Sequence, residues 1–596
     1  MRTRWSNGVW ACLILWVAPL VVSKGQQTDE LRQRFEDLKT WAEKGNADAQ
    51  TDLGLCYYRG QGVARDNAEA VKWFRRAAEQ GDARAQYSLA LRYHRGEGVP
   101  ADAKEAANWF RKAFNQGDPK ADYFRGLCHL YGAGTRGDAA EAFECFRRAA
   151  ERGEAYAQVH LGLCYLQGSG VAKNPFEAVK WFQRAADQGH AYARCCVGYC
   201  YLAGEGVAKN SAKALECFHQ AADQGEADAQ FRIGLCRLHG EGAPKALAEA
   251  AQWFRKAADQ GHAAAQYCLG ASYYRGEGVP ASYAEAVKWF QKAAQQGNAE
   301  AQYFFGFCLL KGQGVPRDAE EAVKWFRKAA EQESGDAKYQ LAACHLLGEG
   351  TPKNRREGLK WLRKAAEHGH ATAQYTLGLH CIHGEGVAKD PAEAARWFQK
   401  AADQGNAFAQ RDLGQCYLRG IGVPKNSVEA VKWLHKAAEQ DDAFAEYSMG
   451  ICYYRGEGVI KDVRLAAWWL RKAADQGNAP AQLQLGYFYV TGEGVRKDPV
   501  EAYKWLTLAS VSPGEDERNF LASLDMLPGS PPAPAALPIL AARAYKWLKP
   551  APPSVASQAR KYLTALEPMM TPAQIAKARQ MAREFKPRRS ALPRDR

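Results

Sequence analysis

The motifs that usually indicate catalysis are missing from this chain of 596 residues. It has no Walker A motif, no H-E-x-x-H zinc motif and no C-x-x-C pair. Its paired carboxylates occur only where helices are expected to begin. We therefore predict that the protein is not an enzyme, that it needs no cofactor and that it holds no metal.

Two near-matches do not change that prediction. Residues 132–137 fit the pattern G-x-G-x-x-G, but a dinucleotide site needs a strand before it, and this stretch joins two helical segments. The densest set of potential metal ligands is His368, His370, His380, Cys381 and His383. Two of them, His380 and His383, fall in a repeated core position and a variable turn position, which favours structural roles.

Long apolar runs are absent except near the N-terminus. Arg2 and Arg4 precede Val9–Val22, which is apolar apart from Pro19. This run is shorter than the roughly 18 residues that span a bilayer. Residues 1–25 are therefore interpreted as a secretory signal, with an uncleaved anchor as the alternative. No N-x-S/T sequon occurs, which favours bacterial export, so we expect a periplasmic or secreted protein.

Charge of one sign is not concentrated anywhere in the repeated part of the chain. The net charge of +14 is moderate for this length. Lysines and arginines such as Lys324, Arg327 and Lys328 alternate with Glu320 and Glu321. A nucleic-acid groove needs clustered basic residues with exposed aromatics, and the aromatics here occupy core-phase positions. No nucleic-acid partner is expected.

What the chain does have is one unit repeated thirteen times. Tryptophans recur at intervals of 36 residues or twice 36, at Trp73, Trp109, Trp181, Trp253, Trp289, Trp325, Trp361, Trp397, Trp433, Trp469 and Trp505. Cys145 and Cys217 occupy the two remaining positions, so the frame never slips. A fixed period of this length is typical of repeat arrays.

Each unit predicts two helices. In the copy that begins at Asp390, this residue suits an N-cap, Pro391 the first helical position, and Trp397 an apolar stripe. Gly405 ends this helix, because glycine tolerates the left-handed conformation, and a second helix starts near Asn406.

The unit resembles the Sel-1-like repeat family, which is related to TPR proteins. The family pattern can be read on Ala409–Val423 and Ala430–Asp441, and the resemblance covers about residues 46–510. It implies an all-α, right-handed superhelical solenoid of about 13 helix-turn-helix repeats of 36 residues. It also implies an adaptor role in which the first helix of each pair lines the concave face.

Sixteen cysteines raise the question of disulfides in an exported chain. Nine share one repeat position: Cys56, Cys128, Cys164, Cys200, Cys236, Cys308, Cys344, Cys416 and Cys452. Equivalent residues of adjacent repeats lie roughly 9–10 Å apart, beyond the limit of about 7 Å for a disulfide, so this ladder is predicted to be buried free thiols. Cys195, Cys196, Cys268 and Cys381 lie outside it, with their redox state open.

The ends of the array depart from the period. Residues 26–45 predict an N-terminal capping helix. Residues 511–570 predict a duplicated C-terminal cap with proline-rich linkers, because two sequence segments recur there with an offset of 42 residues. Residues 571–596 predict a closing helix and a basic tail. Within the array, the glycine expected at Glu333 has moved to Gly335, which predicts a local bend.

A surface for a partner is predicted on the first helices. One position is aromatic in eight repeats: Tyr87, Tyr123, Phe231, Tyr267, Tyr303, Tyr339, Tyr375 and Tyr447. These rings could pack between adjacent first helices, or line a groove for an extended peptide or a partner's helix. The position three residues earlier varies more and is a candidate for specificity: Arg84, Lys120, Tyr156, Tyr192, Phe408 and Phe444.

The function predicted from these features is a non-catalytic exported scaffold that binds proteins or peptides on the concave face. The alternative is a solenoid that binds carbohydrate or the cell wall through exposed aromatics. The identity of the partner and the oligomeric state are not encoded in any motif.

Overall fold

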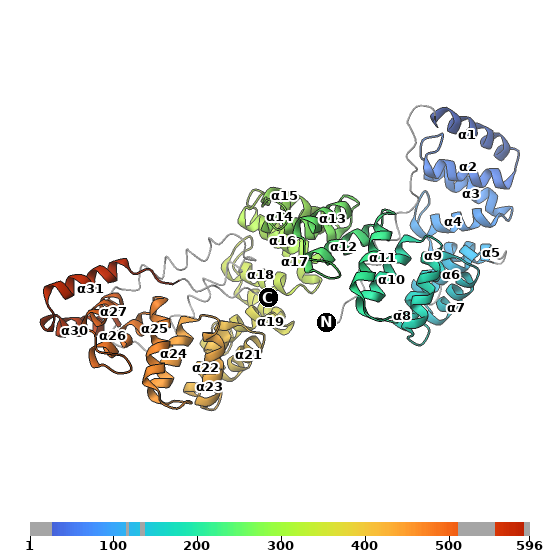
Figure 1. Cartoon of the computed structure of the whole chain (residues 1–596). Coiled ribbons are helices and arrows are strands. Elements are labelled where there is room, and N and C mark those ends of the chain that lie inside the picture. The colour runs from blue at the N-terminus through green and yellow to red at the C-terminus, as the bar shows by residue number, and fades with distance from the viewer. Residues whose placement is uncertain (1–26, 115–118, 132–136, 511–554, 589–596) are drawn as a thin grey trace. The chain divides into compact units, whose positions relative to one another are not determined.

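The computed structural model describes residues 27–114, 119–131, 137–510 and 555–588. Within these ranges the chain forms 29 α-helices and no strand, so the predicted all-α fold is confirmed. The chain divides into two compact units, residues 1–266 and 267–596. In each unit the helices follow one another as antiparallel pairs (Figure 1).

The helices of the array alternate between a first and a second helix of each repeat. The first helices are α2 (Ala47–Arg59), α4 (Ala83–Arg95), α6 (Pro119–Tyr131), α8 (Ala155–Gln167), α10 (Ala191–Ala203), α12 (Ala227–His239), α14 (Ala263–Arg275), α16 (Ala299–Lys311), α18 (Gly335–Leu347), α20 (Ala371–His383), α22 (Ala407–Arg419), α24 (Ala443–Arg455) and α26 (Ala479–Thr491). The second helices are α3 (Asn67–Glu79), α5 (Ala103–Phe114), α7 (Ala139–Glu151), α9 (Pro175–Asp187), α11 (Ser211–Ala222), α13 (Leu247–Asp259), α15 (Tyr283–Gln295), α17 (Ala319–Glu331), α19 (Arg355–Glu367), α21 (Pro391–Asp403), α23 (Ser427–Ala438), α25 (Val463–Asp475) and α27 (Pro499–Ser510).

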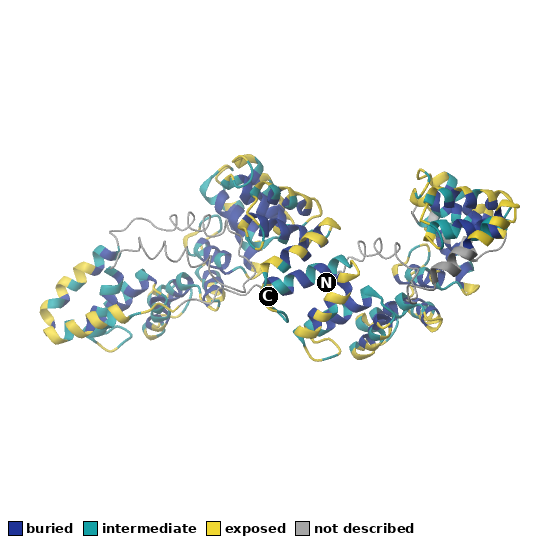
Figure 2. Cartoon of the chain, turned by 90° about the horizontal axis from the view of Figure 1, so that it is seen from above, coloured by how far each residue is buried: buried dark blue, intermediate teal, exposed yellow. Residues whose placement is uncertain are grey.

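The two helices of a repeat approach closely at one position. In α20 the residue is Gly378, and a Cβ atom built there would lie 2.6 Å from the ring of Phe398 in α21. Phe398 is 1% exposed, and the equivalent second-helix residues are also buried. Figure 2 shows the resulting pattern, with buried residues where helices meet and exposed residues on turns and outer faces. Each core is therefore local to neighbouring helices, as expected for a repeat array.

A buried glutamine joins each repeat to the one before it. The Gln410 side chain in α22 donates to the carbonyl of Ala402, at the end of α21, over 3.1 Å. It also accepts from Gln440, which follows α23, over 2.8 Å. Gln410 is 5% exposed, so its bond to Ala402 is shielded from water, and the bond from Gln440 is partly shielded. Since one side chain bonds to two other helix ends, it fixes the first helix against the preceding repeat and against its own partner.

Three of the four charged residues that replace this glutamine, Asp122, Lys338 and Glu446, lie next to a residue of opposite charge, whereas the fourth, Arg194, is only half-buried. Asp122 is fully buried and lies 3.2 Å from Arg148 and 3.6 Å from Arg152. Glu446 is paired with Lys472 at 2.9 Å. A buried charge without a partner would be strongly destabilising. Arg148 and Lys472 occupy the position three residues after the tryptophan slot, which is basic in most repeats, so a basic partner for each carboxylate is already present.

The bend predicted at Glu333 is absent: α17 and α18 keep the usual bounds. Glu333 takes the left-handed conformation itself, with φ of 69°, and Gly335 lies inside α18. The reason is that Lys338 replaces the buried glutamine and is only 2% exposed, and Glu333 pairs with it at 2.5 Å and also with His368. The moved glycine therefore reflects a local ion pair and no change in the path of the chain.

The ends of the array are closed by helices outside the repeats. At the N-terminus, α1 (Gln27–Glu43) packs on α2. At the C-terminus, α30 (Val555–Leu566) and α31 (Pro572–Glu584) both pack on α27, and η1 (Glu567–Met569) lies between them in the chain. Phe585 then covers the ring of Trp505 at 5.6 Å. The predicted signal at residues 1–25 and residues 511–554 of the predicted cap lie outside the described residues.

Two glycines that flank α22 distinguish the effect of backbone conformation from the effect of packing. Gly405 and Gly422 both have positive φ. A Cβ at Gly405 would meet nothing within 4 Å, whereas at Gly422 it would lie 1.9 Å from the Pro391 carbonyl oxygen. We expect Gly405→Ala to destabilise the array by about 1 kcal/mol. Gly422→Ala should destabilise it by about 3 kcal/mol, because backbone must move as well. Chemical denaturation with hydrogen exchange of α21 and α22 measures both; equal losses would contradict the close packing.

The two non-glycine residues with positive φ, Glu333 and Asp441, should respond in opposite ways to glycine. Asp441→Gly relieves backbone strain and loses only a long, exposed ion pair with Lys472, so stability should rise by about 0.5–1 kcal/mol. Glu333→Gly removes the carboxylate that pairs with buried Lys338, and stability should fall by about 2 kcal/mol. The same denaturation experiment compares the two; a stabilised Glu333→Gly would disprove the role of the ion pair.

Candidate interaction surface

One side of the first helix α2 is free of the core. In α2 the buried residues are Ala49, Gln50, Thr51, Leu53 and Gly54. Positions 48, 52, 55 and 59 are separated by four, three and four residues, so they share the opposite face of the helix. We refer to these four positions, and their equivalents at intervals of 36 residues, as the first-helix face.

In the first unit an apolar seam runs along this face. The third position of the face carries Leu55, Leu91, Leu127, Leu163 and Leu235, with Tyr199 in the remaining repeat. All six side chains are half-buried: each contacts its own core but keeps part of its surface open. In the second unit this position is buried at Phe307 and Leu379 and polar at Gln415, although Ile451 and Tyr487 are half-buried there. The unbroken row of half-open apolar side chains is therefore confined to the first unit.

Neighbouring first helices contact one another through the variable positions that flank the seam. Arg84 in α4 reaches Asp48 in α2 at 2.7 Å. Tyr156 in α8 lies 6.1 Å from the ring of Tyr123 in α6. These contacts differ in chemistry from one repeat to the next, whereas the seam between them stays apolar.

The most polar part of the first-helix face centres on Asp228 in α12. Its carboxylate accepts from the Tyr199 hydroxyl over 2.5 Å and from the Cys195 thiol over 3.3 Å, and His262 lies 3.6 Å away. Burial by itself would raise the pKa of the Asp228 carboxyl. The hydrogen bond from His262 and the charge of Arg232 lower this pKa by more, so that it lies below its usual range. The carboxylate is therefore charged at neutral pH and fully engaged, which suits a structural anchor.

The structure places the eight predicted aromatic residues in packing positions. Five are buried, namely Tyr123, Phe231, Tyr303, Tyr339 and Tyr375, and three are half-buried, namely Tyr87, Tyr267 and Tyr447. Six of them contact the phenylalanine of their own second helix, with ring centroids 5.7–6.1 Å apart. Their contacts are those of core residues, and their role in partner binding stays a prediction.

The position predicted for specificity is more open. Tyr156 is 46% exposed and Arg84 is also exposed, whereas Tyr192, Phe408 and Phe444 are half-buried. The side chain of Lys120 lies outside the described residues. Tyr156 makes an edge-on contact with His190 at 4.7 Å, so its ring is oriented although it faces solvent.

The basic residues of the second helices contact aromatic and acidic side chains of the same helix. In ten repeats a lysine or arginine three residues after the tryptophan lies 3.8–5.3 Å from the centre of its ring. In seven repeats the lysine just before the tryptophan pairs with a glutamate three residues earlier. These contacts spread the positive charge evenly instead of forming a basic groove.

The cysteines are structural. All 14 that the structure describes are free thiols. Burial raises the pKa of the ladder thiols, to about 12 at Cys164, Cys308 and Cys416, so they are not reactive nucleophiles. No group of three or more potential metal ligands occurs among the described residues.

Sequence reasoning missed the leucine seam. Its signal was present, since leucine recurs in the first unit at a fixed position of the repeat. A leucine in a helix next to a core is usually buried, however, and only the arrangement of neighbouring helices shows that these remain half-open.

The helix pairs, their common period and their local cores define the class: an α-helical repeat protein. Comparison with protein families assigns it further, because the Sel1 repeat matches thirteen consecutive segments from residue 47 to residue 510. The chain belongs to the Sel1 repeat family.

Two solved structures are similar to this chain. A protective antigen of uropathogenic Escherichia coli with an SLR fold is 31% identical, over 94% of this chain and 96% of that one, with a TM-score of 0.35. A Sel1 repeat protein from Oxalobacter formigenes is 33% identical, over 52% of this chain and 93% of that one, with a TM-score of 0.42. No curated protein matches the chain.

A half-buried histidine on the first-helix face should make one repeat sensitive to acid. Burial lowers the pKa of His160 from 6.5 to about 4, and its Nδ1–H donates to the Tyr156 carbonyl over 3.0 Å. Because the unfolded chain binds the proton more readily, stability falls as the pH drops from 6.5 to 4, by about 3 kcal/mol. Hydrogen exchange of α8 against pH measures this loss.

The matched variant is His160→Phe, because Phe304 occupies the equivalent position in α16. It should remove most of the pH dependence of α8 while the protein stays folded. An unchanged pH profile in this variant would show that another group is responsible.

Proposed function

We propose that the protein is an exported, non-catalytic scaffold that binds an extended segment of a partner protein along the first-helix face of the first unit. Repeat solenoids of this kind are generally interaction scaffolds, and the Sel1 family assignment supports that role here. The observation that carries the proposal is the half-open seam formed by Leu55, Leu91, Leu127, Leu163 and Leu235.

The spacing of the seam specifies the kind of ligand. Adjacent helices pack roughly 9–10 Å apart, and an extended chain in the polyproline II conformation has three residues per turn and rises about 3.1 Å per residue. An extended ligand therefore places one side chain in three against each repeat. A partner segment with apolar residues at every third position would fit the leucines, and its intervening polar residues could contact variable neighbours such as Arg84 and Asp48.

Export is the second part of the proposal and depends on the apolar segment at residues 1–25. Cell fractionation tests it directly. Recovery in the periplasm or medium is expected, and retention with cytoplasmic proteins would refute it.

Site-specific photo-crosslinking in cells tests the binding face. A photoreactive amino acid at Leu163 should capture a protein partner, identified by mass spectrometry. The same group at Lys180, an exposed residue on α9 of the same repeat, should not capture it. Leu163→Asp should weaken the complex at least about tenfold, because it puts a charge against an apolar contact. Equal crosslinking at Leu163 and Lys180 would sink the proposed surface.

One observation favours a second candidate function, carbohydrate or cell-wall binding. Tyr156 presents nearly half of its surface to solvent with its ring held by His190, a geometry in which an aromatic ring can stack on a sugar. A pull-down with isolated wall glycan distinguishes the two. Retention that is lost in Tyr156→Ala, with no protein crosslinked at Leu163, would favour the glycan.

A further inference from the structure

We infer that the outer surface at the start of α25 docks on an anionic lipid surface. This surface comprises Ile460, Lys461, Arg464, Leu465 and Trp468, together with Arg496 from the next turn. It lies on a second helix and the turn before it, so it is separate from the first-helix face and independent of the proposed function.

The second helix α25 has lost the ion pair that its counterparts keep. In seven repeats a glutamate and a lysine three residues later form a salt bridge at this place, as in Glu429 and Lys432 at 2.9 Å. Here the two positions carry Leu465 and Trp468. Two charged side chains are thus replaced by two apolar ones within a single turn of helix.

Apolar side chains are also unusually open here. Trp468 is 52% exposed, and Ile460, in the turn before α25, is 91% exposed. Six other repeats have proline at the position of Ile460. A turn that projects an isoleucine almost completely into water gains no packing from it within this chain, and hydrophobic residues at such a place are characteristic of surfaces that contact another phase or molecule.

The cations around these residues have no acidic partner in the described part of the chain. Lys461, Arg464 and Arg496 are all exposed, and none of them forms a salt bridge there. No acidic residue occupies the first turn of α25, so the partial positive charge of its N-terminus is reduced only by the capping carboxylate of Asp462. The surface is therefore positive as well as apolar.

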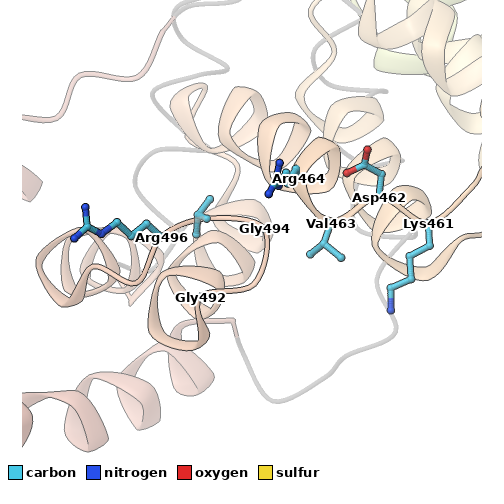
Figure 3. A pocket seen from close by; sticks show the side chains of 8 residues that line it. Lys461, Asp462, Val463, Arg464, Gly492, Gly494 and Arg496 are labelled. Atoms are coloured by element: carbon cyan, nitrogen blue, oxygen red, sulfur yellow. The ribbon is translucent and has the colours of Figure 1, made fainter.

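The arrangement of the cations suits a broad anionic surface rather than a single small anion. They line an open hollow of about 640 Å³. Figure 3 shows the side chains of Lys461, Arg464 and Arg496 spaced across it and pointing away from one another. A phosphate clamp would need them to converge on one point. Separated cations with tryptophan and isoleucine beside them match a bilayer interface, where lipid headgroups are spread out and tryptophan prefers the boundary.

This contact would be peripheral. None of the described helices is both long enough and apolar enough to cross a bilayer. A few apolar side chains with several cations give reversible binding that depends on anionic lipid and on salt.

Vesicle sedimentation of the full chain tests the inference. The parent protein should bind vesicles of phosphatidylcholine mixed with phosphatidylglycerol, bind phosphatidylcholine alone at least about tenfold more weakly, and lose the difference in high salt. The double variant Leu465→Glu, Trp468→Lys restores the residues of the other repeats and should fold normally. It should lower binding to anionic vesicles by about tenfold.

Two further variants complete the design. Arg464→Ala, which introduces the residue found at this position in six repeats, should lower binding and its salt dependence. Phe176→Ala is the matched control: Phe176 is 68% exposed on α9, where the ion pair of Glu177 and Lys180 is intact, and this change should have no effect.

Two outcomes would overturn the inference. One is equal retention on anionic vesicles of the parent and the double variant, which would assign any binding to another part of the chain. The other is no binding to vesicles together with binding of poly-L-glutamate that is lost in the double variant, which would assign an acidic protein segment to this surface instead.

Discussion

The array depends on the buried glutamine that ties each repeat to the previous one. Its amide donates to the end of the preceding second helix and accepts from the glutamine after its own second helix, as Gln302 does with Ala294 and Gln332. The Gln302 side chain is buried, so leaving its amide without these bonds would be costly. The exceptions support this view: Asp122, Lys338 and Glu446 each lie near an opposite charge, and Arg194 is only half-buried.

Because the buried glutamine and its bonds recur along the array, differences in sequence between repeats are concentrated at the surface. Glycine and phenylalanine at the close approach of the two helices, and the glycines of each turn, leave little freedom inside the repeat. Positions on the first-helix face and at the start of the second helices can change without disturbing it. The leucine seam of the first unit and the altered start of α25 arise at such positions, which is why they are informative about partners.

Much of the fold could be predicted because the same sequence pattern occurs thirteen times at a fixed period. Trp397, Gly405 and Asp390 fix the phase, the helix end and the cap, and the structure has them in these roles. The site was less predictable. An aromatic residue such as Tyr303 follows the repeat whether it packs inside or faces a ligand, so periodicity could not separate the two. The bend predicted at Glu333 was wrong for a related reason. Glu333 pairs with Lys338, and the sequence does not show that Lys338 is buried.

The sequence by itself determined the class of fold, the number of repeats and the bounds of the helices, because these depend on local capping, on turn glycines and on an apolar stripe within each unit. Only the tertiary structure decided which of the apolar residues are open. Exposure depends on how closely neighbouring helices approach, and that distance is set by side chains 20 to 40 residues away. The half-open leucines, the exposed Ile460 and Trp468, and the ion pairs that replace the buried glutamine all follow from it.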